Sequence, residues 1–284
     1  MNPTTNFAGI SDKYAGYETS KIIILPVPYK EENNPIKGTS NGTNALLTAT
    51  HHMQLYDIET NTEVYKEGIH IAKPLSGFTS ASEMVDEVYG QVKNYIKRNK
   101  FVSLVGGEAS VSIGAIKAAN ECFDDLTVLH IGANANLRNE YEGSKYHSKC
   151  AMYQANQQMN LVQVGIRSMH KTEKTVMNPD QLFFAYEMAA EDYWMDTVTD
   201  LLSENVHITF DLNGMDPSLI SGVCNPEPGG LFWYETLEFL QKVFKEKKVV
   251  GLNMTGLCPN DHDKTSAVLA ARLLYKMLTY KFQL

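Results

Sequence analysis

The chain lacks long apolar runs and clustered positive charge, and each absence excludes a class of protein. Hydrophobic residues make up 43% of its 284 positions, yet no run approaches the roughly 18 to 20 apolar residues of a membrane helix. The first residues, MNPTTNFAGISDKY, contain no basic region followed by an apolar one, so we expect no secretory signal. Lysine and arginine are scattered and the formal net charge is −8, which argues against a nucleic-acid partner. We therefore expect neither nucleic acid nor a membrane as a partner.

Cysteine is also scarce, and the glycines form no phosphate-binding loop. The four cysteines lie far apart, at positions 122, 150, 224 and 258, without the CxxC pairs of a zinc knuckle or a redox dithiol. Free buried thiols are typical of a reducing compartment, so we expect a cytoplasmic protein. The segment GANAN does not match a dinucleotide fingerprint, which excludes the commonest nucleotide-binding motif.

What the chain does have is a regular alternation of apolar runs and helical patterns. The runs KIIILPV, FVSLVGG, LTVLHIG, NLVQVGI, HITFDLN and VVGLNMT each end at a turn residue or a short polar step. Nearly continuous apolarity predicts strands that are buried on both faces of a parallel sheet. Amphipathic segments lie between them, most clearly over residues 82–100, where Met84, Val85, Val88, Val92 and Ile96 follow helical spacing.

This alternation predicts an α/β fold, a three-layer α/β/α arrangement around a mainly parallel central sheet. No repeat, low-complexity tract or linker divides the chain, so we expect a single domain over residues 1–284, with its longest polar insertion at 28–44. In such sheets the binding crevice lies beyond the carboxyl ends of the strands. The loops after Val105, Ile131, Phe210 and Leu252 are therefore expected to meet there.

Four segments in these loops, in order along the chain, resemble motifs of the ureohydrolase family of arginases, agmatinases and formimidoylglutamases. They are LVGGEASVSIGAIKAA, LHIGANANLRNEYEGSKYH, FDLNGMDPSLISGVCNPEPGG and VVGLNMTGLCP, which look like the GGDH, DAHxD and DxDxxDP segments and the late strand of that family. The resemblance covers roughly residues 20 to 280 and is strongest to the agmatinase branch. It implies an arginase/deacetylase-like fold. It also implies two manganese ions, held by histidine and aspartate, whose bridging hydroxide attacks a guanidinium carbon.

The resemblance places most of that metal site on residues that are poor manganese ligands. The expected ligand positions fall on Ala109, Gly132, Asn134, Asn136, Asp211 and Asn213. Among them only Asp211 keeps a carboxylate. The expected substrate-site positions fall on Ser148 and Gly256. Scaffold positions such as Gly106-Gly107, Asp216-Pro217 and the PEPGG loop remain intact.

Other polar residues near the expected pocket have two interpretations each. Glu108 is either a relocated acid or a residue that stabilises its own turn, and Asp211 holds a cation or accepts backbone hydrogen bonds. His147 is a relocated ligand or a turn histidine, and Asn253 is a further polar residue of the pocket. The asparagine cluster either binds a small molecule or surrounds water.

The substitutions have a common electrostatic consequence. Without metal ions, several carboxylates in one partly desolvated pocket would repel one another, whereas asparagine and glycine remove the charge. This pattern predicts a catalytically inactive protein, a structural, regulatory or ligand-binding subunit with no catalytic residues and no cofactor. By family resemblance we expect a homo-oligomer, a trimer or hexamer, with a catalytically intact paralogue as a possible partner.

Two alternatives remain open at this point. The first is an active agmatinase-like amidinohydrolase that uses manganese in a rearranged or single site built from Asp211, Glu108 and His147. The second is a metal-free protein that binds a guanidino or polyamine compound. Metal analysis, urea release and ligand-induced stabilisation separate these alternatives.

Overall fold

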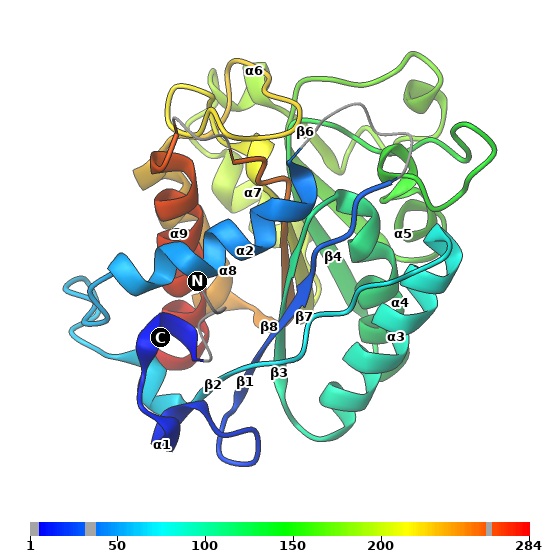
Figure 1. Ribbon diagram of the computed structural model, residues 1–284. Helices are drawn as coiled ribbons and strands as arrows, with labels where there is room; N and C mark the ends of the chain where they lie inside the picture. The colour runs from blue at the N-terminus through cyan, green and yellow to red at the C-terminus, as the bar shows by residue number, and fades with distance from the viewer. Residues whose placement is uncertain (1–5, 32–37, 260–262) are drawn as a thin grey trace.

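An eight-stranded parallel sheet forms the centre of the molecule in a computed structural model that describes residues 6–31, 38–259 and 263–284 (Figure 1). The strand order is β2-β1-β3-β8-β7-β4-β5-β6, and the pairings between neighbouring strands are parallel. The strands are β1 (Ile22–Val27), β2 (Ile69–Ile71), β3 (Phe101–Gly106), β4 (Leu126–Ile131), β5 (Asn160–Ile166), β6 (Leu182–Phe184), β7 (Asn205–Asp211) and β8 (Lys248–Thr255). This arrangement confirms the predicted α/β class and the parallel sheet.

Helices cover both faces of the sheet. Figure 1 shows α2, α7, α8 and α9 on one face and α3, α4 and α5 on the other, and a separate apolar core lies under each group. The helices are α1 (Asp12–Ala15), α2 (Thr39–Ala49), α3 (Ala81–Lys97), α4 (Ser112–Cys122), α5 (Tyr153–Gln158), α6 (Ala185–Met188), α7 (Trp194–Leu201), α8 (Trp233–Glu246) and α9 (Thr265–Gln283). Short 3-10 turns are η1 (Phe7–Gly9), η2 (Thr50–His52), η3 (Val64–Glu67), η4 (Ala109–Val111), η5 (Ser148–Cys150), η6 (Glu173–Thr175) and η7 (Leu212–Gly214).

Local sequence accounts for most of these elements. All six residues of β1 are buried, as a strand covered on both faces requires. Helix α3 begins after Ser80, whose hydroxyl accepts a hydrogen bond from the Glu83 amide at 3.1 Å and so satisfies one of the free donors of the first turn. Its buried residues Met84, Val85, Val88 and Val92 lie on one stripe, as predicted.

Strands β2 and β6 and helices α1, α2, α5 and α6 were not predicted, and three of these six elements have an evident reason. Strands β2 and β6 have only three residues each and lie at the two edges of the sheet, where little apolar sequence is needed. Helix α2 begins at Thr39, inside the stretch 28–44 that was predicted to be a polar loop; residues 32–37 of that stretch lie outside the described part. Its sequence has weak helix formers. Packing holds it, since a Cβ at Gly42 would lie 2.0 Å from the Leu257 carbonyl oxygen.

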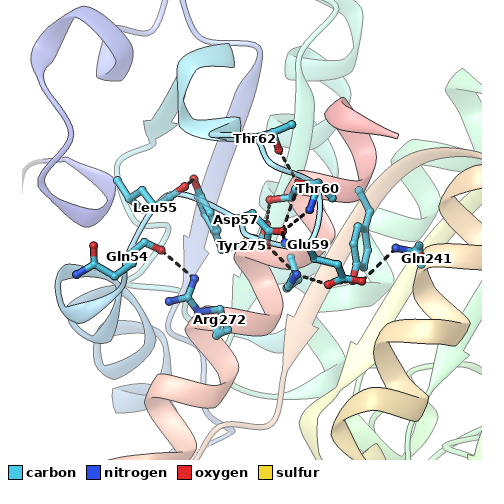
Figure 2. Close-up of polar contacts among 12 residues, drawn as sticks. Gln54, Leu55, Asp57, Glu59, Thr60, Thr62, Gln241, Arg272 and Tyr275 are labelled. Atoms are coloured by element: carbon cyan, nitrogen blue, oxygen red, sulfur yellow. Dashed lines mark hydrogen bonds and ion pairs between the residues drawn. The ribbon is translucent and has the colours of Figure 1, made fainter.

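A buried ion-pair network fastens the loop 53–62 to helix α9 (Figure 2). Lys276 Nζ lies 2.8 Å from Asp57 Oδ2, and their side chains are 9% and 2% exposed. Lys276 also donates to Glu59. Burial would raise the pKa of Asp57, but the hydrogen bonds from Lys276 and Thr60 outweigh it and lower that pKa. The network therefore keeps a buried carboxylate charged.

None of the helices in the described ranges is long and apolar enough to cross a membrane.

Candidate active site

A small cavity lies at the carboxyl ends of the four central strands β3, β8, β7 and β4. Its volume is about 160 Å³. It is lined by Glu108, Ala109, Asn134, Asn136, Ser148, Lys149, Asp211, Asn213, Cys224, Asn225, Glu227 and Gly256. The loops expected to meet at this edge do so. The structure also brings together all the expected metal and substrate positions except Gly132, which is buried and does not line the cavity.

Asp211 ends β7 and supplies a buried carboxylate to the cavity floor. Its side chain accepts a hydrogen bond from the Asn213 amide at 3.1 Å, and the residue is 8% exposed. Burial raises the pKa of Asp211 to about 6, while the Asn213 hydrogen bond and the charge of Arg167 oppose that rise. Asp211 thus combines a turn-stabilising role with an acid group that faces the cavity.

The asparagines bind to each other and to the backbone. Asn213 Oδ1 accepts a hydrogen bond from the Ala133 amide at 2.9 Å, and Asn213 Nδ2 donates to Asn134 Oδ1 at 2.9 Å. The oxygens of both amides are therefore already engaged. Asn136 is buried and adopts a left-handed backbone with φ of 54°, a conformation that asparagine tolerates better than most residues.

Glu108 binds a distant loop rather than its own turn. Its side chain makes no capping bond to η4. Its Oε1 accepts a hydrogen bond from the backbone amide of Glu31 at 3.2 Å, and the residue is 4% exposed. The interpretation of Glu108 as a cap for its own turn is therefore corrected, because this bond ties the chain after β1 to the cavity wall.

His147 and Asn253 do not line the cavity. His147 lines a neighbouring pocket, where its Nε2 lies 2.8 Å from Glu31 Oε2 and its ring packs against Tyr141 at 4.4 Å between centroids. Its Nδ1 accepts a hydrogen bond from the Lys149 amide, so the turn role describes it. Asn253 lies inside β8, 1% exposed. A metal site built from Asp211, Glu108 and His147 is not assembled here.

Arg167 holds a loop that lines the cavity, and it was not among the predicted site residues. Its guanidinium donates to the carbonyl oxygens of Asn213, Met215 and Glu227, at 2.8, 3.3 and 2.7 Å, and to others nearby. This joins η7 to the PEPGG loop. Lys149, Cys224 and Asn225 also line the cavity but were not singled out as site residues. Cys224 and Asn225 lie inside the segment that ends in PEPGG, and this was the available signal for them, whereas Lys149 lies two residues after the nearest matched segment.

The described residues do not fit a pair of manganese ions. At the expected ligand positions Asp211 is the remaining carboxylate, Ala109 and Gly132 have no donor atom, and the amide oxygens of Asn134 and Asn213 are engaged by hydrogen bonds. Neutral amides are weaker manganese ligands than carboxylates and imidazoles. Within residues 6–31, 38–259 and 263–284 no group of three histidine, cysteine, aspartate or glutamate side chains could hold a metal ion.

Comparison with known proteins gives consistent similarities. The model of the "Arginase family" matches residues 20–279. The chain is 30% identical over 274 residues to an N(1)-aminopropylagmatine ureohydrolase of Thermus thermophilus, covering 95% of this chain and 93% of that protein. It is 29% identical over 281 residues to a protein of the same name from Synechocystis, covering 95% and 92%. The crystal structure of agmatine ureohydrolase of Thermoplasma volcanium superposes with a TM-score of 0.86 at 22% identity, covering 96% and 94%.

These similarities confirm the predicted arginase-type fold and correct the predicted function. Proteins that share 29% and 30% of their residues with this chain over nearly its whole length are named ureohydrolases. The expectation of a catalytically inactive subunit depended only on the identity of ligand positions. That prediction is wrong, because the relatives are named as ureohydrolases, and the alternative of an active amidinohydrolase agrees better with their names.

Proposed function

Because the chain belongs to the arginase family, we propose that it is a ureohydrolase-type amidinohydrolase of linear cationic guanidino compounds. The names of the relatives, N(1)-aminopropylagmatine ureohydrolases, suggest a substrate of that kind. The observation that carries the proposal is the cavity at the carboxyl ends of the central strands, whose lining includes the carboxylates of Glu108, Asp211 and Glu227. Carboxylates recognise a guanidinium through paired, charge-assisted hydrogen bonds.

The proposed reaction is the hydrolysis of one carbon–nitrogen bond. Water adds its oxygen to the guanidinium carbon, the bond to the alkyl nitrogen breaks, and that nitrogen leaves as an ammonium group. The products are urea and an amine, and the atoms and charges balance without an oxidant or a reductant. The residues of this chain bind and orient the cation. Asp211 and Glu227 supply negative charge at the cavity, and Arg167 holds the loop that carries Glu227.

The direct test is urea release by the purified full chain, with agmatine and N(1)-aminopropylagmatine as substrates. Each substrate is assayed in a chelator and again with added Mn²⁺, because an active member of this family was expected to use that ion. We expect urea and the corresponding amine in equal amounts from one or both compounds, and a loss of at least tenfold in kcat/KM for Asp211→Asn.

The matched control is Asp200→Asn, which neutralises an exposed carboxylate on α7 and should leave the rate unchanged. Absence of urea from both substrates under both conditions would refute the proposed reaction. Ligand binding without urea would favour a metal-free guanidino- or polyamine-binding protein instead.

Assembly and location belong to the proposal as well. We propose that the chain forms a homo-oligomer, as expected from its family, with a paralogue as a possible additional subunit. Light scattering during size-exclusion chromatography measures the mass of the chain alone and mixed with a paralogue, and a monomer in both samples would contradict this. Cys122, Cys150 and Cys224 form no disulfide, which supports a reducing, cytoplasmic location.

A further inference from the structure

Neighbouring atoms occupy the space that a side chain at Gly132 would need. A Cβ at Gly132 would lie 2.8 Å from His130 Nε2 and 3.1 Å from His130 Cε1. His130 is 1% exposed and its Nδ1 lies 2.9 Å from the Gln163 amide nitrogen, which also donates to the Ala135 carbonyl at 2.8 Å. The imidazole is thus packed and hydrogen-bonded in place. An aspartate at 132 would have to displace it.

The same is true at Gly256, where the family resemblance places a substrate-binding glutamate. A Cβ there would lie 2.3 Å from Asp211 Oδ1, and Gly256 has φ of 90°, a backbone conformation that other residues rarely adopt. The Asp211 carboxylate therefore uses the room that a side chain at 256 would need. At Gly132 and at Gly256 alike, neighbouring side chains occupy the space that a metal-binding or substrate-binding side chain would need.

The amides close the remaining approach to a metal pair. Asn213 is 3% exposed and is bonded at both ends of its amide, to the Ala133 backbone and to Asn134. A cation bound to either amide oxygen would have to share that oxygen with one of these hydrogen bonds. Asn134 and Asn213 are therefore hydrogen-bonded within the protein and do not form a preformed metal site that lacks only its ions.

We infer that this cavity binds its guanidinium or amidinium ligand directly on its own side chains, without a two-manganese centre. Asp211 is the principal contact, because its carboxylate is buried and faces the cavity. The lining carries three acidic side chains, Glu108, Asp211 and Glu227, against the single lysine Lys149, and this balance favours a cation. The ligand class depends on the proposed function, whereas the independence from manganese depends only on the packing and hydrogen bonds at the expected ligand positions.

The test measures metal and ligand binding separately on the chelator-treated full chain. The electron paramagnetic resonance signal of free Mn²⁺, followed while protein is added, reports bound metal. Titration calorimetry with agmatine, in EDTA and again in excess Mn²⁺, reports ligand affinity. We expect no stoichiometric loss of the free Mn²⁺ signal and the same agmatine Kd in both buffers. Asp211→Asn should weaken agmatine at least tenfold, and Asp200→Asn should not.

Two bound Mn²⁺ per chain, or agmatine binding that appears only with Mn²⁺, would overturn the inference. Failure of agmatine and N(1)-aminopropylagmatine to bind in either buffer would overturn it too. Urea measured in the same samples separates this result from the proposed function. Metal-independent binding without urea refutes the reaction and leaves the inference standing, whereas urea release with two bound Mn²⁺ does the reverse. The unfolding temperature of each variant establishes that it is folded.

Discussion

At the scale of single residues, Gly256 shows how closely the cavity wall is packed. Its left-handed φ of 90° and the 2.3 Å between its potential Cβ and Asp211 Oδ1 are separate constraints. Gly77 has a similar φ of 86°, but nothing lies within 4 Å of its potential Cβ. The two glycines therefore separate the cost of backbone strain from the cost of a steric clash.

We expect Gly77→Ala to lower the free energy of unfolding by roughly 1 to 2 kcal/mol, the cost of a left-handed alanine. Gly256→Ala should cost more, roughly 2 to 5 kcal/mol, because overpacking adds to that strain. Urea denaturation of both variants measures the difference. Equal losses would show that the contact with Asp211 relaxes freely.

Arg167 is a second position where one side chain serves many partners. It is half-buried, and burial lowers its pKa while the nearby carboxylates of Asp216, Glu227 and Asp211 oppose that effect. Its donors satisfy backbone carbonyls from three separate segments. Removal of the guanidinium leaves several carbonyls of the cavity loop without a protein donor.

For Arg167→Ala we expect a loss of about 3 kcal/mol in unfolding free energy, together with faster hydrogen exchange in residues 226–230. Arg98→Ala is the control, since Arg98 is exposed and donates to the Tyr17 hydroxyl at 3.1 Å; it should change stability by less than about 0.5 kcal/mol. Exchange mass spectrometry and denaturation report the two effects. Unchanged exchange in the loop would argue against this positioning role.

At the scale of elements, the network in Figure 2 decides how the loop 53–62 is held. Lys276, on α9, approaches both Asp57 and Glu59. Tyr280, one turn further along α9, also donates to Glu59, and Asp57 accepts from Thr60. A buried carboxylate with these partners is stable, but the same carboxylate without its cation is costly.

Lys276→Met is expected to destabilise the chain by about 3 kcal/mol, because it leaves Asp57 charged and buried. The double variant Asp57→Asn with Lys276→Met should recover part of this loss, which a double-mutant cycle measures. Lys242→Met provides the control. Lys242 pairs with Asp196 and Glu246, which are 61% and 46% exposed, and such pairs contribute about 0 to 1 kcal/mol. Equal effects at 276 and 242 would contradict a buried network.

Whether a strand or helix could be predicted from the sequence depended on how deeply it is buried. The central strands β3, β4, β7 and β8 were found from apolar runs, because a strand covered on both faces must be apolar nearly throughout. The edge strands β2 and β6 were not predicted, since three residues are too few to show a recognisable hydrophobic pattern. Helix α2 was not predicted because its residues have low helix propensity, and the helix is stabilised by packing against the chain near Leu257.

At the scale of the whole molecule, a buried histidine couples folding to pH. His207 lies inside β7, 2% exposed, and burial lowers its pKa to about 4, against a smaller opposing effect of Asn253. The folded chain therefore resists protonation of this ring, whereas the unfolded chain accepts the proton near the ordinary histidine pKa of 6.5. Its contribution to stability is complete above pH 6.5 and is lost as the pH falls toward 4.

We expect the unfolding free energy to fall between pH 6.5 and pH 4 by up to about 1.4 kcal/mol per pH unit from this group. The variant His207→Gln, which has no titrating ring, should show a shallower fall over that window. Urea denaturation at several pH values provides the comparison. An identical slope in both proteins would mean that other groups govern the acid sensitivity.

The fold class, the family and the edge of the sheet where the cavity forms could be predicted from the amino-acid sequence. These follow from periodicity and motif order, which are properties of the chain as written. The sequence also identified the residues at Gly132, Asn134, Asn136 and Asn213, but not what they do to the protein's activity, and the inference of inactivity drawn from them was mistaken.

The partners of the cavity's polar atoms, by contrast, depend on the three-dimensional packing of distant segments. The Asn213 amide meets Ala133 across 80 positions of sequence, and Glu108 meets the Glu31 backbone across 77. The His147 side chain pairs with Glu31 and is not a relocated metal ligand. A hydrogen bond depends on distances of a few tenths of an ångström between segments that no local pattern relates. Residue identity therefore indicated a neutralised site, and packing showed that its amides are bound to the protein itself.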